Sequence, residues 1–295
     1  MNQRKIIIGT RGSKLALQQA DIVSRAIHKF HPDCHVEIKI IKTEGDTNQN
    51  PIPLDTVGKG WFTKEIEKEL LESCIDVAVH SLKDLPELLP PGLHISSYLD
   101  REDPRDVLIS RENKVLSELE FGAVIGTDSI RRKVQILALR ADLVVESIRG
   151  NVLTRLEKLD AGMYDAVVLA AAGIKRLGVE DRIAQYFTAT EVMPAPGQGI
   201  LAVETREEDM TINTLMKEIG DSKATFAAIA ERSFSHAIGG GCKTPVGACA
   251  HLKGDRLTLE GMFSSGAGHI RYETVEGLAS EAEELGVLLA KKIQS

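Results

Sequence analysis

Cys242 lies in a glycine-rich, proline-bounded loop whose composition suits covalent chemistry. The run is Gly239-Gly240-Gly241-Cys242-Lys243-Thr244-Pro245-Val246-Gly247. A thiol on such a loop is exposed and has few neighbouring side chains, as a cysteine that carries a covalently bound group requires. A structural cysteine is expected inside a strand or helix, where it packs as a small apolar side chain. The loop alone leaves open an ordinary turn that happens to contain a thiol.

Three other segments place glycine, hydroxyl and arginine groups where a helix is expected to begin. We call residues 8–14, 125–132 and 148–155 the first, second and third cradle. Backbone N–H groups and the helix dipole favour an anion at such a place. Arginine adds bidentate recognition of a carboxylate or a phosphate, which this argument does not distinguish. The alternative is plain helix capping by Ser13, Asp128 or Asn151. No cradle has the GxxxxGK[ST] pattern, which argues against a nucleotide.

Lys83 and Asp84 follow a strand expected over residues 76–80, at its carboxyl end. Adjacent residues of opposite charge can divide the work of a site. The lysine would hold a substrate carboxylate, while the aspartate would handle a proton or stabilise a developing cation. The alternative is a surface ion pair before the turn at Pro86.

Composition excludes several classes of protein. The chain has 295 residues, 43% hydrophobic and 27% charged, and a net charge of -7, which argues against a general nucleic-acid binder. It has no run of ~18 apolar residues, no signal-peptide pattern at its start and no CxxC pair. We therefore expect a cytoplasmic protein with reduced thiols and no membrane partner. Locally, however, arginines gather, which indicates a specific anionic ligand unless they are solvated helix-face charges: Arg131, Arg132, Arg149, Arg155 and Arg176.

The elements that must position these residues alternate between strand and helix, which predicts an α/β fold with mainly parallel sheets. Strands are expected at 5–9, 36–41, 76–80, 95–99, 107–110, 123–126, 143–148, 166–169 and 200–204. Helices are expected at 13–30 and 61–73, and from about 129, 152 and 170. From residue 221 a helix, three antiparallel strands and a final helix at 281–293 predict a smaller α+β domain. The domains are expected at 1–99 with 200–219, at 100–199 and at 220–295.

Eight segments, in order, resemble the porphobilinogen deaminase (hydroxymethylbilane synthase) family. They cover nearly the whole chain, which makes the resemblance far more specific than any single motif. The matching segments are 9–19 (GTRGSKLALQQ), 58–65 (GKGWFTKE), 79–86 (VHSLKDLP), 101–106 (REDPRD), 126–132 (GTDSIRR), 149–152 (RGNV), 196–199 (PGQG) and 240–242 (GGC).

The resemblance implies a tetrapyrrole-pathway transferase with two periplasmic-binding-protein-like domains and a third, smaller domain. Such an enzyme joins four porphobilinogen molecules onto a dipyrromethane primer, which is bound by a thioether to the cysteine matching Cys242, and releases hydroxymethylbilane. Each pyrrole bears an acetate and a propionate, which accounts for arginine cradles in an acidic protein. The resemblance implies no metal and a monomer. The rival hypothesis is a non-catalytic polyanion-binding protein on the same fold, which would lack the extra mass of the primer.

The resemblance also implies roles for individual residues. Asp84 would protonate the departing amine and stabilise the cationic azafulvene. The residues implied to hold the primer are Cys242, Lys83, Asp84, Thr127, Ser129, Arg131, Arg132, Arg149 and Gly150. The residues implied to bind substrate are Arg11, Ser13, Lys59, Phe62, Arg149, Arg155, Arg176, Gln198 and Gly199, with 43–60 as a lid. Asp128 departs from the family's serine, and we expect its carboxylate to cap the helix that follows.

Overall fold

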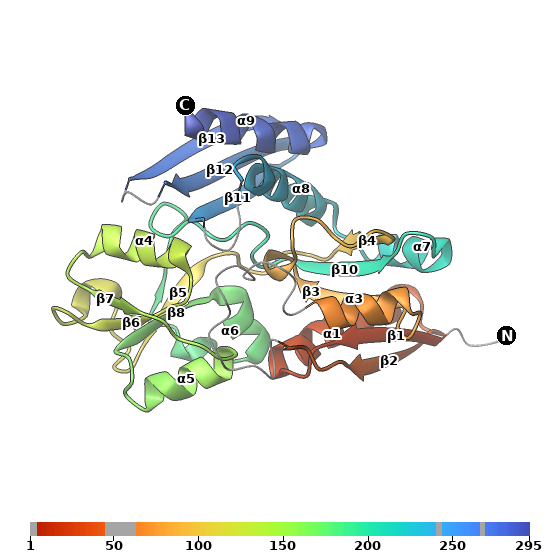
Figure 1. The fold of residues 1–295 in the computed structure, drawn as a ribbon, viewed down its shortest axis with the longest axis horizontal. Helices are drawn as coiled ribbons and strands as arrows, with labels where there is room; N and C mark the ends of the chain where they lie inside the picture. Colours follow the sequence, from red (N-terminus) through yellow and green to blue (C-terminus); the bar gives the residue numbers. More distant parts are fainter. Residues whose placement is uncertain (1–4, 45–62, 240–243, 266–268) are drawn as a thin grey trace. The chain divides into compact units, whose positions relative to one another are not determined.

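The computed structural model describes residues 5–44, 63–239, 244–265 and 269–295 (Figure 1). The chain forms two compact units. Unit 1 comprises Met1–Arg101 and Ile200–Thr225, and unit 2 comprises Glu102–Gly199 and Phe226–Ser295. Of the expected lid, only Thr43 and Glu44 belong to the described residues.

Unit 1 is built on a five-stranded sheet with the strand order β2-β1-β3-β10-β4. Its strands are β1 (Lys5–Thr10), β2 (His35–Ile40), β3 (Val77–Ser81), β4 (Leu93–Tyr98) and β10 (Leu201–Arg206). Its helices are α1 (Lys14–Phe30), α3 (Lys64–Leu71) and α7 (Met210–Glu218), with a short 3-10 turn, η1 (Leu82–Asp84).

The sheet of unit 1 is apolar on both faces. Successive side chains of a strand point to opposite faces, and in this sheet both sets contain apolar side chains. In β1, Ile6 and Ile8 pack in one cluster with side chains of α1 and α7. Ile7 points to the other cluster, which contains Ile66 and Leu70 of α3. Helices on both faces of the sheet therefore leave the ends of the strands, where the cradle residues lie, as the polar edge of the unit.

Unit 2 contains a second five-stranded sheet, with the order β7-β6-β8-β5-β9. Its strands are β5 (Asp106–Ser110), β6 (Val124–Gly126), β7 (Val144–Glu146), β8 (Ala166–Ala170) and β9 (Gln185–Tyr186). Its helices are α4 (Ile130–Leu139), α5 (Val152–Asp160) and α6 (Ala171–Leu177), with 3-10 turns η2 (Leu116–Glu118) and η3 (Glu180–Arg182). Helix α4 packs on one face and helices α5 and α6 on the other.

In each of these two sheets a single strand runs opposite to the other four. In unit 1 it is β10, which pairs antiparallel with both β3 and β4. In unit 2 it is β5, which pairs antiparallel with β8 and β9. Both reversed strands follow directly on the segments where the chain passes from one unit to the other. Each therefore begins at the edge where the other strands end.

The last part of unit 2 is an antiparallel sheet with two helices. Its strands are β11 (Val246–Lys253), β12 (Arg256–Ser264) and β13 (Ile270–Leu278). Its helices are α8 (Ser222–Ala237) and α9 (Ala282–Gln294), and the 3-10 turn η4 (Ala279–Glu281) precedes α9. Helix α8 begins in unit 1. Helix α9 lies along β12 and β13 (Figure 1). The buried carboxylate of Glu231 joins this sheet to the preceding linker, because it accepts hydrogen bonds from Ala250 N (2.7 Å) and Gly197 N (2.6 Å).

The observed elements confirm the predicted α/β class and the smaller C-terminal α+β part. Helix α7 and the two-residue strand β9 were not among the expected elements. The three domain ranges remain a prediction. In the described part of the chain, no helix has the length and apolar character needed to cross a membrane.

Gly286 provides a test of how closely α8 and α9 pack. A Cβ at this position would lie 2.6 Å from the Ala230 oxygen and 2.6 Å from the Phe234 nitrogen, and these backbone atoms cannot rotate away. We predict that Gly286→Ala lowers the free energy of unfolding by about 1–3 kcal/mol, although alanine is the better helix former by about 1 kcal/mol. Urea titration followed by circular dichroism measures this change. The exposed control Lys291→Ala should stay within about 0.5 kcal/mol of the original, and an equally small effect of Gly286→Ala would contradict the tight packing.

Candidate active site

The second cradle begins helix α4 at the carboxyl end of β6. Ser129 is the N-cap, since its hydroxyl accepts a hydrogen bond from Arg132 N at 3.4 Å. The hydroxyl of Thr127 accepts one from Ser129 N at 3.2 Å. These two side chains therefore shape the turn that leads into the helix.

The expectation that Asp128 caps this helix is wrong. Its carboxylate accepts a hydrogen bond from the hydroxyl of Ser147, and it lies 4.0 Å from Nε of Arg149. The first helical residue is Ile130, so the cap position falls on Ser129, one residue later than expected. Asp128 thus links the second cradle to the third.

Arg131 and Arg132 follow this cap and are buried around the carboxylate of Asp106. Nη1 of Arg131 lies 2.6 Å from Oδ2 of Asp106. Nε and Nη2 of Arg132 lie 3.1 Å and 2.7 Å from Oδ1. The two arginines keep 5% and 6% of their surface exposed, and Asp106 keeps none. Two guanidinium groups and one carboxylate form a buried cluster, called here the Asp106 cluster.

The Asp106 cluster stays ionised because its members compensate one another. Burial by itself raises the pKa of Asp106, but the charges of Arg131 and Arg132 outweigh it and hold that pKa well below its usual range. Burial likewise lowers the pKa of Arg131, and Asp106 opposes this. With two positive groups and one negative group, the cluster has a net charge of +1.

The linker before β10 completes this cluster. Gln198 is fully buried, and its amide nitrogen donates to Oδ1 of Asp106 at 3.0 Å and to Pro104 O at 2.6 Å. Arg176 of α6 donates to Gly199 O at 2.6 Å. Burial lowers the pKa of Arg176 to about 10, so this side chain remains charged at neutral pH. The side chain of Gln198, expected to bind substrate, is instead bonded inside unit 2.

The third cradle is more open than the second. Asn151 caps α5 by accepting from Thr154 N at 3.0 Å. Gly150 has φ +111, and a Cβ there would lie 2.7 Å from the Thr154 side chain, so only glycine fits this turn. Nε of Arg155 donates to Gly150 O at 2.8 Å. The side chain of Arg149 keeps 42% of its surface exposed, which leaves it accessible at the end of β7.

Unit 1 contributes the first cradle and the turn that carries Lys83 and Asp84. Ser13 caps α1 by accepting from Ala16 N at 3.2 Å, and Arg11 beside it is half-buried. Gln19 of α1 donates to the hydroxyl of Ser81 at 2.8 Å, which ties the helix to the end of β3. The first cradle and the end of β3 therefore lie at the same edge of the sheet.

The η1 turn exposes its two charged side chains while its apolar ones anchor it. Leu82 and Leu85 are buried, and Leu82 N donates to Ile200 O at 3.0 Å. Between them, Lys83 and Asp84 are exposed. A charged pair is thereby presented on a turn that is fixed on both sides.

Three of the expected site residues, Cys242, Lys59 and Phe62, lie outside the described residues. Another cysteine, Cys249 on β11, is buried with 1% of its surface exposed, and it packs with Met193 and Met262. This placement agrees with a structural role for Cys249.

Two family models match the chain almost from end to end. Residues 6–214 match "Porphobilinogen deaminase, dipyromethane cofactor binding domain", and residues 225–295 match "Porphobilinogen deaminase, C-terminal domain". This chain belongs to the porphobilinogen deaminase family. It is accordingly a transferase of tetrapyrrole biosynthesis that uses a dipyrromethane cofactor and acts on porphobilinogen, joining four molecules into hydroxymethylbilane.

Individual relatives of the porphobilinogen deaminase family agree with this assignment. The chain is 47% identical over 292 residues to "Porphobilinogen deaminase" of Syntrophomonas wolfei, covering 98% of this chain and 95% of the relative. It is 44% identical to "Porphobilinogen deaminase" of a Roseiflexus species, covering 99% and 96%. Among solved structures, a putative methionine-binding lipoprotein from Bacillus subtilis is similar at 11% identity and a TM-score of 0.44, over 75% of this chain and 92% of that chain. The rival hypothesis of a non-catalytic binding protein is set aside because the matched family model is a cofactor-binding domain.

The residues of unit 2 fit the dipyrromethane of a porphobilinogen deaminase. Its acetate and propionate groups are carboxylates, and the Asp106 cluster has one positive charge in excess. The half-exposed guanidinium of Arg149 adds a positive charge at the neighbouring strand end. Anionic side groups are the ligands that such donors bind.

Sequence reasoning did not select Asp106 as a site residue, although it lies in the matching segment 101–106. The available signal was its place directly before the apolar run Val107–Ile109, because an acid at the start of a buried strand must find a cation. The cations stand 25 and 26 residues further along the chain, and no local pattern connects them to it.

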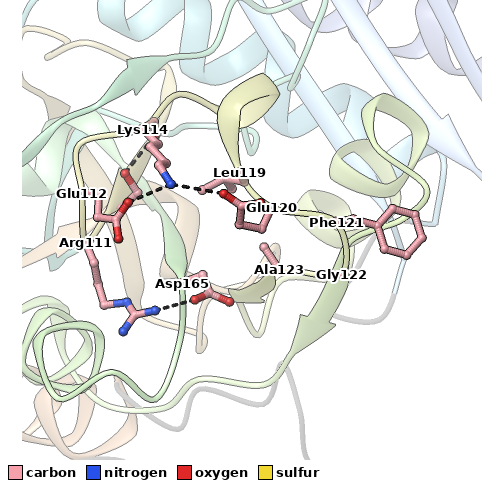
Figure 2. A pocket seen from close by; sticks show the side chains of 10 residues that line it. Arg111, Glu112, Lys114, Leu119, Glu120, Phe121, Gly122, Ala123 and Asp165 are labelled. Atoms are coloured by element: carbon pink, nitrogen blue, oxygen red, sulfur yellow. Dashed lines mark hydrogen bonds and ion pairs between the residues drawn. The ribbon is translucent and has the colours of Figure 1, made fainter.

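A pocket near the start of β6 is separate from these groups (Figure 2). Its charged side chains pair with each other: Arg111 lies 2.6 Å from Asp165, and Lys114 lies 2.7 Å from Glu112. Because these pairs are already satisfied, the pocket has no evident attraction for the carboxylates of porphobilinogen.

The capping assignment in the second cradle can be tested with two substitutions. We predict that Ser129→Ala lowers the free energy of unfolding by about 0.5–2 kcal/mol, because the hydrogen bond to Arg132 N is lost. Asp128→Asn keeps an acceptor for Ser147 and removes only a long, partly exposed ion pair, so its effect should stay below about 0.5 kcal/mol. Urea unfolding of the two variants measures the difference, and the reverse order of effects would restore Asp128 as the cap.

Proposed function

We propose that Asp84 is the catalytic residue of this porphobilinogen deaminase. It would protonate the amine that leaves porphobilinogen, and its carboxylate would then stabilise the resulting cation. The observation that supports this role is the exposed carboxylate of Asp84 on a turn anchored by Leu82 and Leu85. Lys83 beside it would hold a carboxylate of the substrate or of the cofactor.

The dipyrromethane would be joined by a thioether to Cys242, and Lys83 and Asp84 are proposed to bind it as well. When bound, this group supplies the nucleophilic carbon onto which the porphobilinogen units are added. The residues of unit 2 proposed to hold it are Thr127, Ser129, Arg131, Arg132, Arg149 and Gly150. Their hydroxyl, guanidinium and backbone N–H groups would fix its carboxylates.

The growing chain brings further carboxylates, and other residues are proposed to bind them. In unit 1 these are Arg11 and Ser13, with Lys59 and Phe62. In unit 2 they are Arg149, Arg155 and Arg176, together with Gln198 and Gly199. Since Gln198 and Gly199 are buried, they would act mainly by holding Asp106 and Arg176 in place.

The finer features of the setting also belong to this proposal. We expect a monomer that works in the cytoplasm without a nucleic-acid or membrane partner. The net charge of -7 supports the absence of a nucleic-acid partner. Light scattering coupled to size exclusion gives the molar mass directly, and a value of twice 32.1 kDa would contradict the monomer.

Replacing Asp84 tests the catalytic role. Asp84→Asn keeps the size of the side chain but can neither donate nor receive the proton, so turnover should fall at least ~100-fold while porphobilinogen still binds. Steady-state kinetics and intact mass measure both properties. The exposed carboxylate of Asp100 provides the control, because Asp100→Asn removes a charge from the same unit and should leave turnover unchanged. Near-normal turnover of Asp84→Asn would remove Asp84 from the mechanism.

Replacing cysteines tests the site of attachment. Cys242→Ser should abolish both the activity and the extra mass of two pyrrole units. Cys249→Ala should retain both, because Cys249 is buried among apolar side chains. Intact-mass spectrometry of the purified variants decides the matter, and extra mass that persists in Cys242→Ser would place the thioether elsewhere.

A further inference from the structure

We propose that Gln135 and Tyr272 are positioning residues that fix the C-terminal sheet (β11, β12 and β13) against helix α4. Gln135 lies on α4, one turn after Arg131, and Tyr272 lies on β13. Strand β11 begins four residues after Cys242 in the sequence. The pair would thereby set where the cysteine loop enters the sheet relative to the proposed cofactor residues at the start of α4. This inference rests on the proposed attachment of the cofactor to Cys242.

The side-chain amide of Gln135 is buried and has a partner for each of its bonding positions. Its oxygen, Oε1, accepts hydrogen bonds from Met193 N at 2.7 Å and from the hydroxyl of Tyr272 at 3.2 Å. Its nitrogen, Nε2, donates to Arg131 O at 3.1 Å and to Met193 O at 3.3 Å. An amide has two donor hydrogens and two acceptor lone pairs, so these four bonds use it completely. Because Met193 N only donates, the orientation of the amide is fixed.

Met193, in the linker before β10, is the residue where α4 and the C-terminal sheet meet. Its N–H and its carbonyl both bond to Gln135, as they would bond to a neighbouring strand. The same carbonyl accepts from Nη1 of Arg131. Its side chain packs with Cys249 and Met262 of the C-terminal sheet. The linker is therefore held from both sides, and Arg131 is bonded to the same linker residue.

One face of the C-terminal sheet makes this contact. Gly247, Met262 and Tyr272 are direct neighbours across β11, β12 and β13, so they lie in one row on the same face. We call these three residues the docking row. A Cβ on Gly247 would lie 2.8 Å from Cγ of Met193 and 2.9 Å from Pro194 O. The linker thus touches the backbone of the sheet directly, and a larger residue at Gly247 would push the two apart.

The opposite face of the C-terminal sheet packs on its own helices. A Cβ on Gly261, which neighbours Met262, would lie 2.6 Å from Leu289 of α9 and 3.0 Å from Phe234 of α8. Tyr272, on the face of the docking row, is 43% exposed. Its hydroxyl therefore adds little to the core of the sheet, and its bond to Gln135 joins the sheet to α4.

Matched substitutions on the two faces test this role. Gly247→Ala adds a methyl group at the docking row, whereas Gly286→Ala adds one between α8 and α9. Tyr272→Phe removes only a hydroxyl, and Tyr186→Phe removes one from the similarly exposed strand β9 of the same unit. Apoprotein of each variant, purified from cells that make no porphobilinogen, is incubated with porphobilinogen. Intact-mass spectrometry follows the gain of primer mass, with thermal unfolding measured in parallel.

We expect Tyr272→Phe to load primer about two- to tenfold more slowly, the range that corresponds to one hydrogen bond. Gly247→Ala should load at least about fivefold more slowly. Gly286→Ala should load at the original rate although it unfolds more readily, and Tyr186→Phe should also load at the original rate. Normal loading of Tyr272→Phe would overturn the proposal. Equal slowing in Gly247→Ala and Gly286→Ala would overturn it too, because loading would then follow stability alone.

Hydrogen exchange of backbone amides gives a second readout that does not depend on Cys242. The N–H of Met193 donates to Gln135, and that of Ala248 donates to a carbonyl of the linker. In Tyr272→Phe both should exchange at least about twofold faster, while the N–H groups inside β5 and β8 keep their rates. Unchanged exchange at Met193 would overturn the proposal. If the original chain gains no mass on Cys242, the carrier role of Cys242 fails, and the exchange rates still decide whether Tyr272 and Gln135 fix the sheet.

Discussion

A carboxylate buried between two guanidinium groups constrains unit 2 more than any other interaction. Removing three charges from water is costly, and the cost is offset only where every charge has a partner at close range. Asp106, Arg131 and Arg132 meet this condition together with Gln198 and two backbone carbonyls. The start of β5, the first turn of α4 and the linker before β10 must therefore keep their positions.

The two reversed strands explain how the chain brings distant segments to this edge. A strand that runs opposite to its neighbours begins where they end, so β5 delivers Asp106 beside the end of β8. In unit 1, the residue before β10 accepts a hydrogen bond from Leu82, the anchor of the turn that carries Asp84. The segments that pass between the units are bonded to each other as well, since Glu102 N donates to Gly199 O at 3.2 Å. The crossover segments thus support both groups of functional side chains.

The arginines that looked alike as a set differ in burial and in their bonded partners. Arg131 and Arg132 are buried against Asp106, Arg155 and Arg176 donate to backbone carbonyls, and Arg149 is half-exposed. A graded set of this kind suits a ligand that lengthens during the reaction, because different carboxylates meet donors of different freedom. Donors that are already fixed by hydrogen bonds need little reorganisation when a charged group binds. They therefore stabilise that charged group more strongly than mobile donors would.

The sequence by itself determined most of the elements, two of the helix caps and the family. Periodicity and cap residues are local signals, so α1 and α5 begin where Ser13 and Asn151 predicted. Eight ordered segments were enough to identify the family, and with it the proposed role of Asp84. Only the tertiary structure decided that Ser129, and not Asp128, caps α4, and that Gln198 donates to the buried carboxylate of Asp106. The partners of Asp106 come from 25 to 92 residues away, brought together by a reversed strand and a linker. A buried carboxylate must have such partners, and burial is a property of the assembled sheet.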